Sequence, residues 1–318
     1  MPRFRGKNKF DYLEVTPGGV LTGYAPYTWG RGNVFYVDSR SWGIGNDSYP
    51  GTNPNEPLAT IQAAYAKCTT AQNDYIILLD GYDNDTATIT VAKTGLHFIG
   101  VNGMNHRAPF VWLKEAGTGA EPVFTLQGGN AANVEIAGFT LGADASTPCI
   151  TTVTGASTEL VYAWIHHVAF AASLDAAFVA QDGILVADGT GLDGTLVEDC
   201  TFGAQIGRDG IRFKNFYQGL IRNNLFTGVT GVGVDAIATG AATGMPDVIS
   251  NKFRAASGAA EGWAISSNAS GAGGGFIDDN HASSSFQTGG NNPYLDSGDA
   301  NQWGVNWKWN AVAAPATT

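Results

Sequence analysis

Short apolar runs that alternate with Gly, Asn and Asp turns fill the chain from residue 75 onward. Several runs share one template, in which a branched aliphatic residue is followed five positions later by phenylalanine. The copies are VEIAGF (134–139), IHHVAF (165–170), VEDCTF (197–202), IRNNLF (221–226) and VISNKF (248–253), and IDDNHA (277–282) is a weaker copy. Self-similarity at a spacing of about 20–50 residues indicates a repeat architecture. The pattern therefore predicts a solenoid.

A second set of short strands lies between these copies, near residues 183–186, 210–213, 233–237 and 262–265. Two or more strands per repeat without helices predict an all-β fold, the right-handed parallel β-helix. Equivalent residues of successive coils then lie about 4.8 Å apart. The phenylalanines that end successive copies should stack in the core: Phe170, Phe202, Phe226 and Phe253. The asparagines two positions earlier should form a ladder at a turn: Asn224, Asn251 and Asn280.

The predicted organisation has three parts. An extended N-terminal docking arm covers residues 1–33, the β-helix covers residues 34–290, and an aromatic-rich C-terminal tail covers residues 291–318. A short helix near residues 60–69 is expected to cap the first coil, because the terminal unit of a solenoid otherwise exposes its core. Thr60 is the candidate N-cap of this helix. Its apolar face has helical spacing: Ile61, Ala64, Tyr65 and Cys68.

The composition agrees with many short strands joined by tight turns. Charged residues make up 14% of the chain, against about 25% in an ordinary domain. Glycine accounts for 43 of the 318 residues, and hydrophobic residues for 44%. Coiled coils and helical bundles have a different composition.

Charge is distributed unevenly along the chain. The net charge of −11 argues against nucleic-acid binding by the body of the protein. Four basic residues nevertheless stand within the first nine positions, with no acidic residue among them: Arg3, Arg5, Lys7 and Lys9. This asymmetry predicts a basic arm that docks on an acidic partner. A solvated, disordered start of the chain is the alternative interpretation.

The cysteines Cys68, Cys149 and Cys200 are odd in number and far apart. This pattern excludes a disulfide framework and a zinc finger, and it indicates assembly in a reducing compartment. The sequence opens without a signal-peptide pattern and has no apolar stretch of about 18 residues, so no membrane association is expected. No metal site and no cofactor are expected, because no motif for either is complete.

Motifs at the start of the repeats and within them match one group of proteins. They are FYVD (35–38), ND (46–47), GT (51–52), TIQA (60–63), GY (81–82) and the later I-x-[ND]-N-x-F copies, and they extend over residues 34–282. In these motifs the chain resembles pectin-lyase-like parallel β-helix proteins. The resemblance implies a superfamily that includes polysaccharide lyases, glycoside hydrolases and bacteriophage surface proteins such as tailspikes. The fold does not decide among these functions.

The candidates for catalysis are Glu198, Arg222, Asp278 and Asp279. A β-helix glycosidase needs two carboxylates facing each other across a groove. The polygalacturonase-like members carry four motifs, of which only Asp278-Asp279 is present here. The pectate-lyase-like members use a catalytic arginine with calcium-binding aspartates, and Arg222 is the matching candidate. The interpretation that we favour is an outward ladder of exposed charges, with His166 before Glu198 and an ion pair of small value.

Three tryptophans stand near the end of the chain: Trp303, Trp307 and Trp309. Such residues either stack on sugars or pack at a subunit interface. The small-residue tail that follows them favours an interface anchor.

We therefore predict a non-catalytic virion surface protein of a bacteriophage, a capsid decoration protein or a short spike anchored by its N-terminal arm. The expected partners are further copies in a homotrimer and other virion proteins such as a capsid shell, with a host surface glycan as a further candidate. Assembly is expected in the host cytoplasm. A polysaccharide-degrading tailspike or lyase remains an alternative and requires carboxylates in a groove. A non-catalytic glycan-binding module also remains open and requires exposed Trp or Tyr on one flat face.

Overall fold

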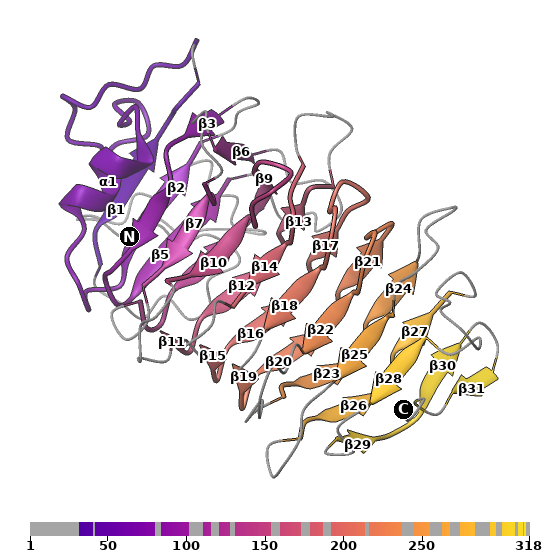
Figure 1. Cartoon of the computed structure of the whole chain (residues 1–318). Helices are drawn as coiled ribbons and strands as arrows, with labels where there is room; N and C mark the ends of the chain where they lie inside the picture. The colour runs from indigo at the N-terminus through magenta and orange to yellow at the C-terminus, as the bar shows by residue number, and fades with distance from the viewer. Residues whose placement is uncertain are drawn as a thin grey trace, which may run out of the picture.

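The computed structural model describes residues 32–40, 42–79, 84–101, 111–115, 121–127, 131–153, 160–172, 179–186, 192–213, 216–236, 245–254, 263–267, 274–283, 293–296, 301–308, 311–313 and 315. These residues form a stack of coils, and most coils contribute one short strand to each of three long sheets (Figure 1). The chain is a right-handed parallel β-helix, as predicted. The basic residues of the predicted arm, Arg3, Arg5, Lys7 and Lys9, lie outside the described residues.

We name the sheets A, B and C in the order in which each coil visits them. Sheet A consists of β1 (Val34–Val37), β2 (Asp74–Leu78), β5 (Leu96–Gly100), β8 (Glu135–Ala137), β12 (Trp164–His166), β16 (Leu196–Glu198), β20 (Leu220–Arg222), β23 (Asp247–Ile249), β26 (Phe276–Asp278) and β29 (Gln302–Trp303). Sheet B consists of β3 (Asn84–Thr86), β6 (Val111–Glu115), β9 (Phe139–Gly142), β13 (Ala169–Phe170), β17 (Thr201–Phe202), β21 (Leu225–Thr227), β24 (Lys252–Arg254), β27 (His281–Ala282), β30 (Asn306–Lys308) and β31 (Ala311–Ala313).

Sheet C follows sheet B along each coil. Its strands are β4 (Ile89–Val91), β7 (Phe124–Leu126), β10 (Ile150–Thr152), β14 (Ile184–Leu185), β18 (Ile211–Phe213), β22 (Val234–Ala236), β25 (Ile265–Ser267) and β28 (Tyr294–Asp296). A smaller sheet D lies between sheets C and A along the chain, with β11 (Leu160–Val161), β15 (Leu192–Asp193) and β19 (Phe216–Tyr217). Neighbouring strands are parallel, except that β31 is antiparallel to β30.

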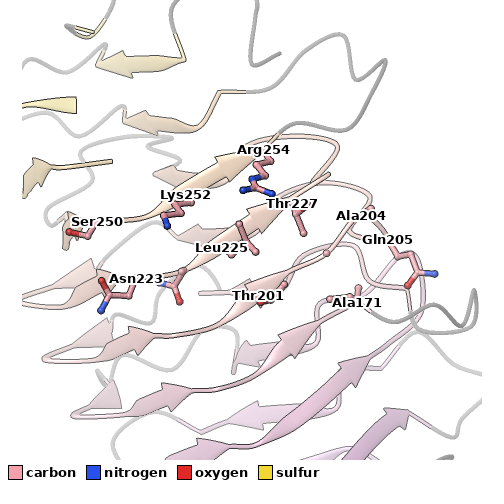
Figure 2. A pocket seen from close by; sticks show the side chains of 13 residues that line it. Ala171, Thr201, Ala204, Gln205, Asn223, Leu225, Thr227, Ser250, Lys252 and Arg254 are labelled. Carbon is pink, nitrogen blue, oxygen red and sulfur yellow. The ribbon is translucent and has the colours of Figure 1, made fainter. Parts of the chain in front are cut away.

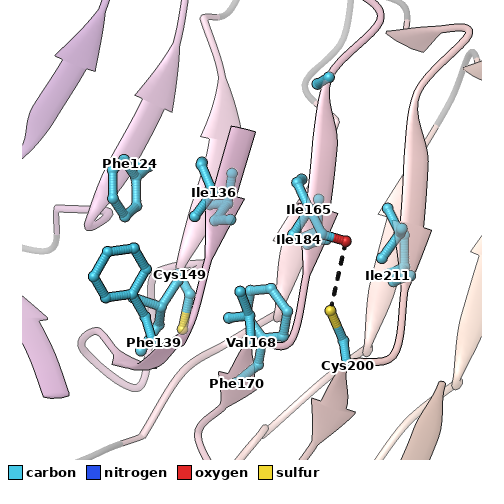
Figure 3. Packing of buried hydrophobic residues seen from close by; sticks show 14 of the residues in the cluster. Phe124, Ile136, Phe139, Cys149, Ile165, Val168, Phe170, Ile184, Cys200 and Ile211 are labelled. Atoms are coloured by element: carbon cyan, nitrogen blue, oxygen red, sulfur yellow. Dashed lines mark hydrogen bonds between the residues drawn. The ribbon is translucent and has the colours of Figure 1, made fainter. Parts of the chain in front are cut away.

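The predicted aromatic stack fills the core beneath sheet B. Its members are register partners on successive coils, and all are buried: Phe170, Phe202, Phe226 and Phe253. Neighbouring ring centroids lie 4.5–4.7 Å apart, and the ring planes are within 12° of parallel. The coil spacing of a parallel sheet therefore sets the ring spacing. Figure 3 shows Phe170 with other side chains of the core.

The first copy of the template is shifted by two residues relative to the sequence alignment. Ile136, and not Val134, is the register partner of Ile165. Phe139 consequently pairs with Val111 and lies outside the aromatic stack. Both Val134 and Ile136 are buried aliphatics. Side chains alternate with a period of two, so a slip of two residues keeps the same face inward and leaves the apolar pattern unchanged.

The predicted asparagine ladder is present at the turn from sheet A to sheet B, and Asn306 extends it beyond Asn224, Asn251 and Asn280. The side-chain Oδ1 of Asn251, Asn280 and Asn306 accepts the backbone N–H of the asparagine one coil earlier, over 2.9–3.1 Å, and the Oδ1 of Asn224 accepts the N–H of Cys200 at 2.9 Å. Each side-chain Nδ2 donates to a sheet A carbonyl of the previous coil, over 2.7–3.0 Å. The amides are at most 1% exposed, so the ladder satisfies groups that water does not reach.

The predicted capping helix is α1 (Ile61–Lys67), at the N-terminal end of the stack (Figure 1). Thr60 is its N-cap, and the Thr60 hydroxyl accepts the N–H of Ala63 at 3.1 Å. Ile61 and Ala64 are buried and belong to the main core. The described residues contain no helix that is long and apolar enough to cross a membrane.

The β-helix continues past the boundary predicted at residue 290. β28, β29 and β30 add a further strand to sheets C, A and B, so the segment predicted as a tail at 291–318 belongs partly to the helix. These strands are only two or three residues long and follow a polar stretch, which hid them in the apolar pattern. β31 then turns back along β30, with Val312 opposite Trp307.

Candidate functional site

A groove of about 780 Å³ crosses the outer face of sheet B over β17, β21, β24 and the residues that follow β13 (Figure 2). One end of it is lined by small residues, among them Ala171, Gly203 and Ala204. Gly203 lies so close to the previous coil that a Cβ there would come within 2.3 Å of the Ala171 carbonyl oxygen. The hollow therefore forms where the repeat carries small side chains instead of large ones.

Lys252 and Arg254 supply positive charge at the other end of the groove (Figure 2). They stand two positions apart on β24, so both side chains point outward while Phe253 points into the core. Both are exposed. None of the described residues that line the groove carries a carboxylate. The groove is thus locally cationic on a chain whose net charge is −11, and it will attract anions.

Polar side chains form the rim of the groove at the turn from sheet A to sheet B. Asn223 and Ser250 line the groove there. The turn position is left-handed in successive coils, with φ of 51–57° at His167, Asp199, Asn223, Ser250 and Asp279. Asn and Asp tolerate this conformation better than most residues. Each coil therefore presents one side chain at this corner, and that residue is polar in all five of these coils.

Glu198 and Arg222 lie on the outer face of sheet A, away from the groove. They share one column with His166 and Asp278, as predicted. Arg222 Nε donates to Glu198 Oε2 at 2.7 Å. The expectation of an exposed pair is wrong for Glu198, which is only 8% exposed. The indole of Trp164 on the neighbouring coil donates to its other oxygen at 2.9 Å, and this contact helps to bury the carboxylate.

The sequence interpretation missed a network beside this pair. Glu135 Oε2 lies 2.5 Å from His97 Nδ1, and Glu135 Oε1 lies 2.9 Å from His166 Nε2. Burial raises the pKa of Glu135, but the hydrogen bonds to His166 and His97 outweigh it and lower the pKa to about 2. The Trp164 ring stacks on His166 at 3.9 Å. These residues come from coils more than 30 positions apart in sequence, and only the register brings them together.

Asp278 and Asp279 do not face each other across a groove. Asp278 Oδ1 accepts the backbone N–H of Val305 at 2.6 Å. The Asp279 side chain is 55% exposed and lies 3.3 Å from His281 Nε2. It also accepts the Ser250 hydroxyl at 2.8 Å. Both carboxylates therefore take part in contacts between neighbouring coils.

The described tryptophans near the end of the chain lie on different sheets. Trp303 is on sheet A, packs against the core and donates its indole N–H to Asp296 at 2.6 Å. Trp307 is on the outer face of sheet B, with its ring within 13° of parallel to His281. Trp309 lies outside the described residues. A shared role of the three as an interface anchor stays a prediction.

A second charged cluster occupies the outer face of sheet C. Arg212 and Asp235 are register partners on β18 and β22, and Arg212 also binds Asp209 at 3.2 Å. Arg208 forms a two-point ion pair with the fully buried Asp182. Burial and the nearby Asp209 charge raise the pKa of Asp235 to about 6, against the opposing effect of Arg212.

The aspartates of this cluster have a structural role that the sequence signals. Asp182 and Asp209 each stand before Gly-Ile at the start of a sheet C strand. Asp182 Oδ1 accepts the backbone N–H of Asp209 at 3.2 Å, and Asp209 Oδ1 accepts that of Val232 at 2.8 Å. They form a ladder between coils, like the asparagines on the other side of sheet B. We therefore place the functional site in the groove and not in this cluster.

Replacing Asp235 with asparagine should stabilise the protein at about pH 8 and have little effect at about pH 4. Its pKa is about 6 in the folded state, against about 3.9 in an unfolded chain. Between these values the folded state binds more protons, so stability falls as pH rises. Above pH ~6 the full penalty of burying the charge is present, on the order of 2–3 kcal/mol, and the substitution removes it.

Urea unfolding at the two pH values measures this effect. Asp279→Asn, at a carboxylate that is 55% exposed, is the matched control and should shift the unfolding midpoint little at either pH. An Asp235→Asn effect of equal size at both pH values would contradict the assignment.

The groove residues were not identified as candidates from the sequence. The signal available was the alternation in KFR (252–254), where two cations flank a residue of the core stack. The same alternation is common on any solvated strand, so it does not by itself indicate a site. The hollow beside it depends on Ala171 and Gly203, which belong to other coils.

Neither a comparison with models of protein families nor one with curated proteins found a match. Solved structures do match. Pectin methylesterase PemA from Erwinia chrysanthemi is 11% identical, with a TM-score of 0.52 over 89% of this chain and 90% of that one. A pectin methylesterase in complex with a hexasaccharide is 12% identical, with a TM-score of 0.51 over 88% and 90%. These identities establish the architecture alone: the chain shares the parallel β-helix of the pectin methylesterases.

Proposed function

We propose that the groove on sheet B binds an acidic polysaccharide. The observation that carries the proposal is the pair of exposed cations, Lys252 and Arg254, in a groove whose described lining has no carboxylate. Hydrogen bonds between ammonium or guanidinium groups and carboxylates are stronger than neutral ones. Thr227 and Asn223 add a hydroxyl and an amide group that suit sugar hydroxyls.

Binding is better supported than cleavage. A glycosidase of the usual type requires two carboxylates flanking the scissile bond. The nearest carboxylate candidates from the sequence lie elsewhere: Glu198 is on sheet A and is held by Arg222 and Trp164. Asp279 reaches the groove only through its hydrogen bond to Ser250.

The fold is compatible with an oligosaccharide ligand. One of the pectin methylesterases that share the architecture was solved in complex with a hexasaccharide. The proposal for this chain rests on its own groove, because the structural likeness extends to the fold and not to individual residues.

Lys252→Glu should weaken the binding of polygalacturonate about tenfold or more. The change removes a charge-assisted hydrogen bond and introduces repulsion of the ligand carboxylates. Isothermal titration calorimetry at low salt is the suitable measurement, because exposed charge interactions weaken at high ionic strength.

Lys67→Glu is the matched control. It changes the net charge by the same amount, and Lys67 is an exposed residue on α1, at the N-terminal end of the stack. It should leave the affinity nearly unchanged. Equal losses from both variants would point to a general charge effect, and absence of binding by the unaltered protein would overturn the proposal.

We further propose the surface of a bacteriophage virion as the setting for this binding. What supports it is the charge asymmetry of the sequence: a basic start, with Arg3, Arg5, Lys7 and Lys9, on an otherwise acidic chain. Such an arm suits attachment to an acidic protein shell. In this setting, the groove would face a glycan of the host surface.

A further inference from the structure

We infer that the binding surface continues from the groove along sheet B to Trp307, so that the polysaccharide lies parallel to the helix axis. The inference rests on the proposed function of the groove and extends it by two coils. It assigns Trp307 and His281 as a distal subsite for the same acidic polysaccharide.

The register of sheet B places the relevant side chains in one column. Thr201, Leu225, Lys252, His281 and Trp307 are successive partners on β17, β21, β24, β27 and β30. The first three line the groove, and Lys252 stands at its far end. The next two members of the column continue in the same direction.

The column faces outward along its whole length. Its neighbours Phe202, Phe226, Phe253 and Ala282 are buried in the core. Successive side chains of a strand point to opposite faces, so the column residues beside them lie on the outer face of sheet B, where Thr201 is 4% exposed and the later members are more exposed. Lys252 is exposed, the His281 side chain is 50% exposed, and Trp307 is half-buried.

The length of this surface is set by the coil spacing. At about 4.8 Å per coil, the groove from β13 to β24 extends about 14 Å along the axis, and the column to β30 extends it to about 24 Å. A short oligosaccharide can therefore occupy the groove alone, whereas a longer one will reach Trp307. Beyond Trp307, Val312 on β31 is 61% exposed and is the last described side chain of the row.

The distal residues suit a sugar unit better than a bare ion. The Trp307 and His281 rings are 6.0 Å apart and within 13° of parallel, so they form one ordered aromatic pair. An indole offers an apolar surface together with an N–H donor, a combination that suits a sugar ring and its hydroxyl groups. Val312 adds apolar surface next to the indole.

The test compares trigalacturonate and hexagalacturonate by calorimetry, with the intact chain and with Trp307→Ala. The intact chain should bind the hexamer more tightly than the trimer. Trp307→Ala should lower the affinity for the hexamer about fivefold and leave the affinity for the trimer within about twofold. Trp307→Phe, which keeps a ring and removes the indole N–H, should give an intermediate loss and serves if the alanine variant does not fold. Tyr162→Ala, at an aromatic residue that is 62% exposed beyond sheet D, is the control and should change neither affinity.

The outcomes separate this inference from the proposed function. If neither oligosaccharide binds the intact chain, the proposed function fails and the distal subsite fails with it. If both bind with equal affinity, or if Trp307→Ala and Trp307→Phe weaken both ligands equally, the distal subsite is wrong while the groove remains a binding site. A loss confined to the hexamer supports the axial arrangement.

Discussion

Replacing Phe202 with alanine should lower the free energy of unfolding by about 3–5 kcal/mol. The Phe202 ring is fully buried and is covered on both faces, by Phe170 at 4.7 Å and by Phe226 at 4.5 Å. It also packs so closely over Gly183 that a Cβ there would lie 2.6 Å from the ring. The rigid coil spacing leaves little scope for neighbours to collapse into the cavity, so the loss should be at the upper end for this kind of change.

Urea unfolding monitored by circular dichroism measures the effect. Phe276→Ala is the matched control, because Phe276 lies on the outer face of sheet A and is 39% exposed. Its replacement should cost below about 1 kcal/mol. A loss below about 1 kcal/mol at Phe202 would contradict the register of the aromatic stack.

Asn251→Ala should destabilise the protein by about 3 kcal/mol or more. The Asn251 Oδ1 accepts both the backbone N–H and the side-chain Nδ2–H of Asn224, at 2.9 and 3.0 Å. Its own Nδ2 donates to the Ile221 carbonyl at 2.9 Å. Removing the amide leaves these buried groups without partners, and each such group costs about 1–3 kcal/mol.

The same denaturation experiment applies to the ladder, with Asn55→Ala as control. Asn55 is exposed in the turn before α1, and its replacement should change stability by less than about 0.5 kcal/mol. Comparably small effects at both positions would show that the asparagine ladder contributes little to the free energy of unfolding and does not hold the coils in register.

The repeats and the core could be predicted because both depend on one short-range pattern. Spacing alone brought Phe170, Phe202 and Phe226 together, since a solenoid converts equal positions in successive repeats into contacts. The same reasoning is ambiguous by two residues, and this is why Phe139 matched the template without joining the stack. The final strands escaped prediction because two or three residues carry too little periodicity.

The candidate site was less predictable, because it depends on what several coils lack as much as on what they carry. The groove exists where Ala171 and Gly203 replace bulky residues, and no single repeat shows this. The burial of Glu198 likewise required knowing that Trp164 lies one coil away. The repeats predicted which residues share a column on the sheet surface. They did not predict how far the side chains of neighbouring columns project, which decides where a groove forms.

The reversal of β31 has a consequence for how long such a structure can grow. A parallel stack offers its last strand as a template for another strand in the same direction, whether from the same chain or from a second molecule. β31 occupies that position on sheet B and runs the opposite way, with Trp307 paired to Val312. A second molecule that approached this end in the parallel direction would meet an antiparallel edge in sheet B. The hairpin therefore occupies the edge of β30, so that a second molecule cannot continue sheet B by parallel pairing with that strand.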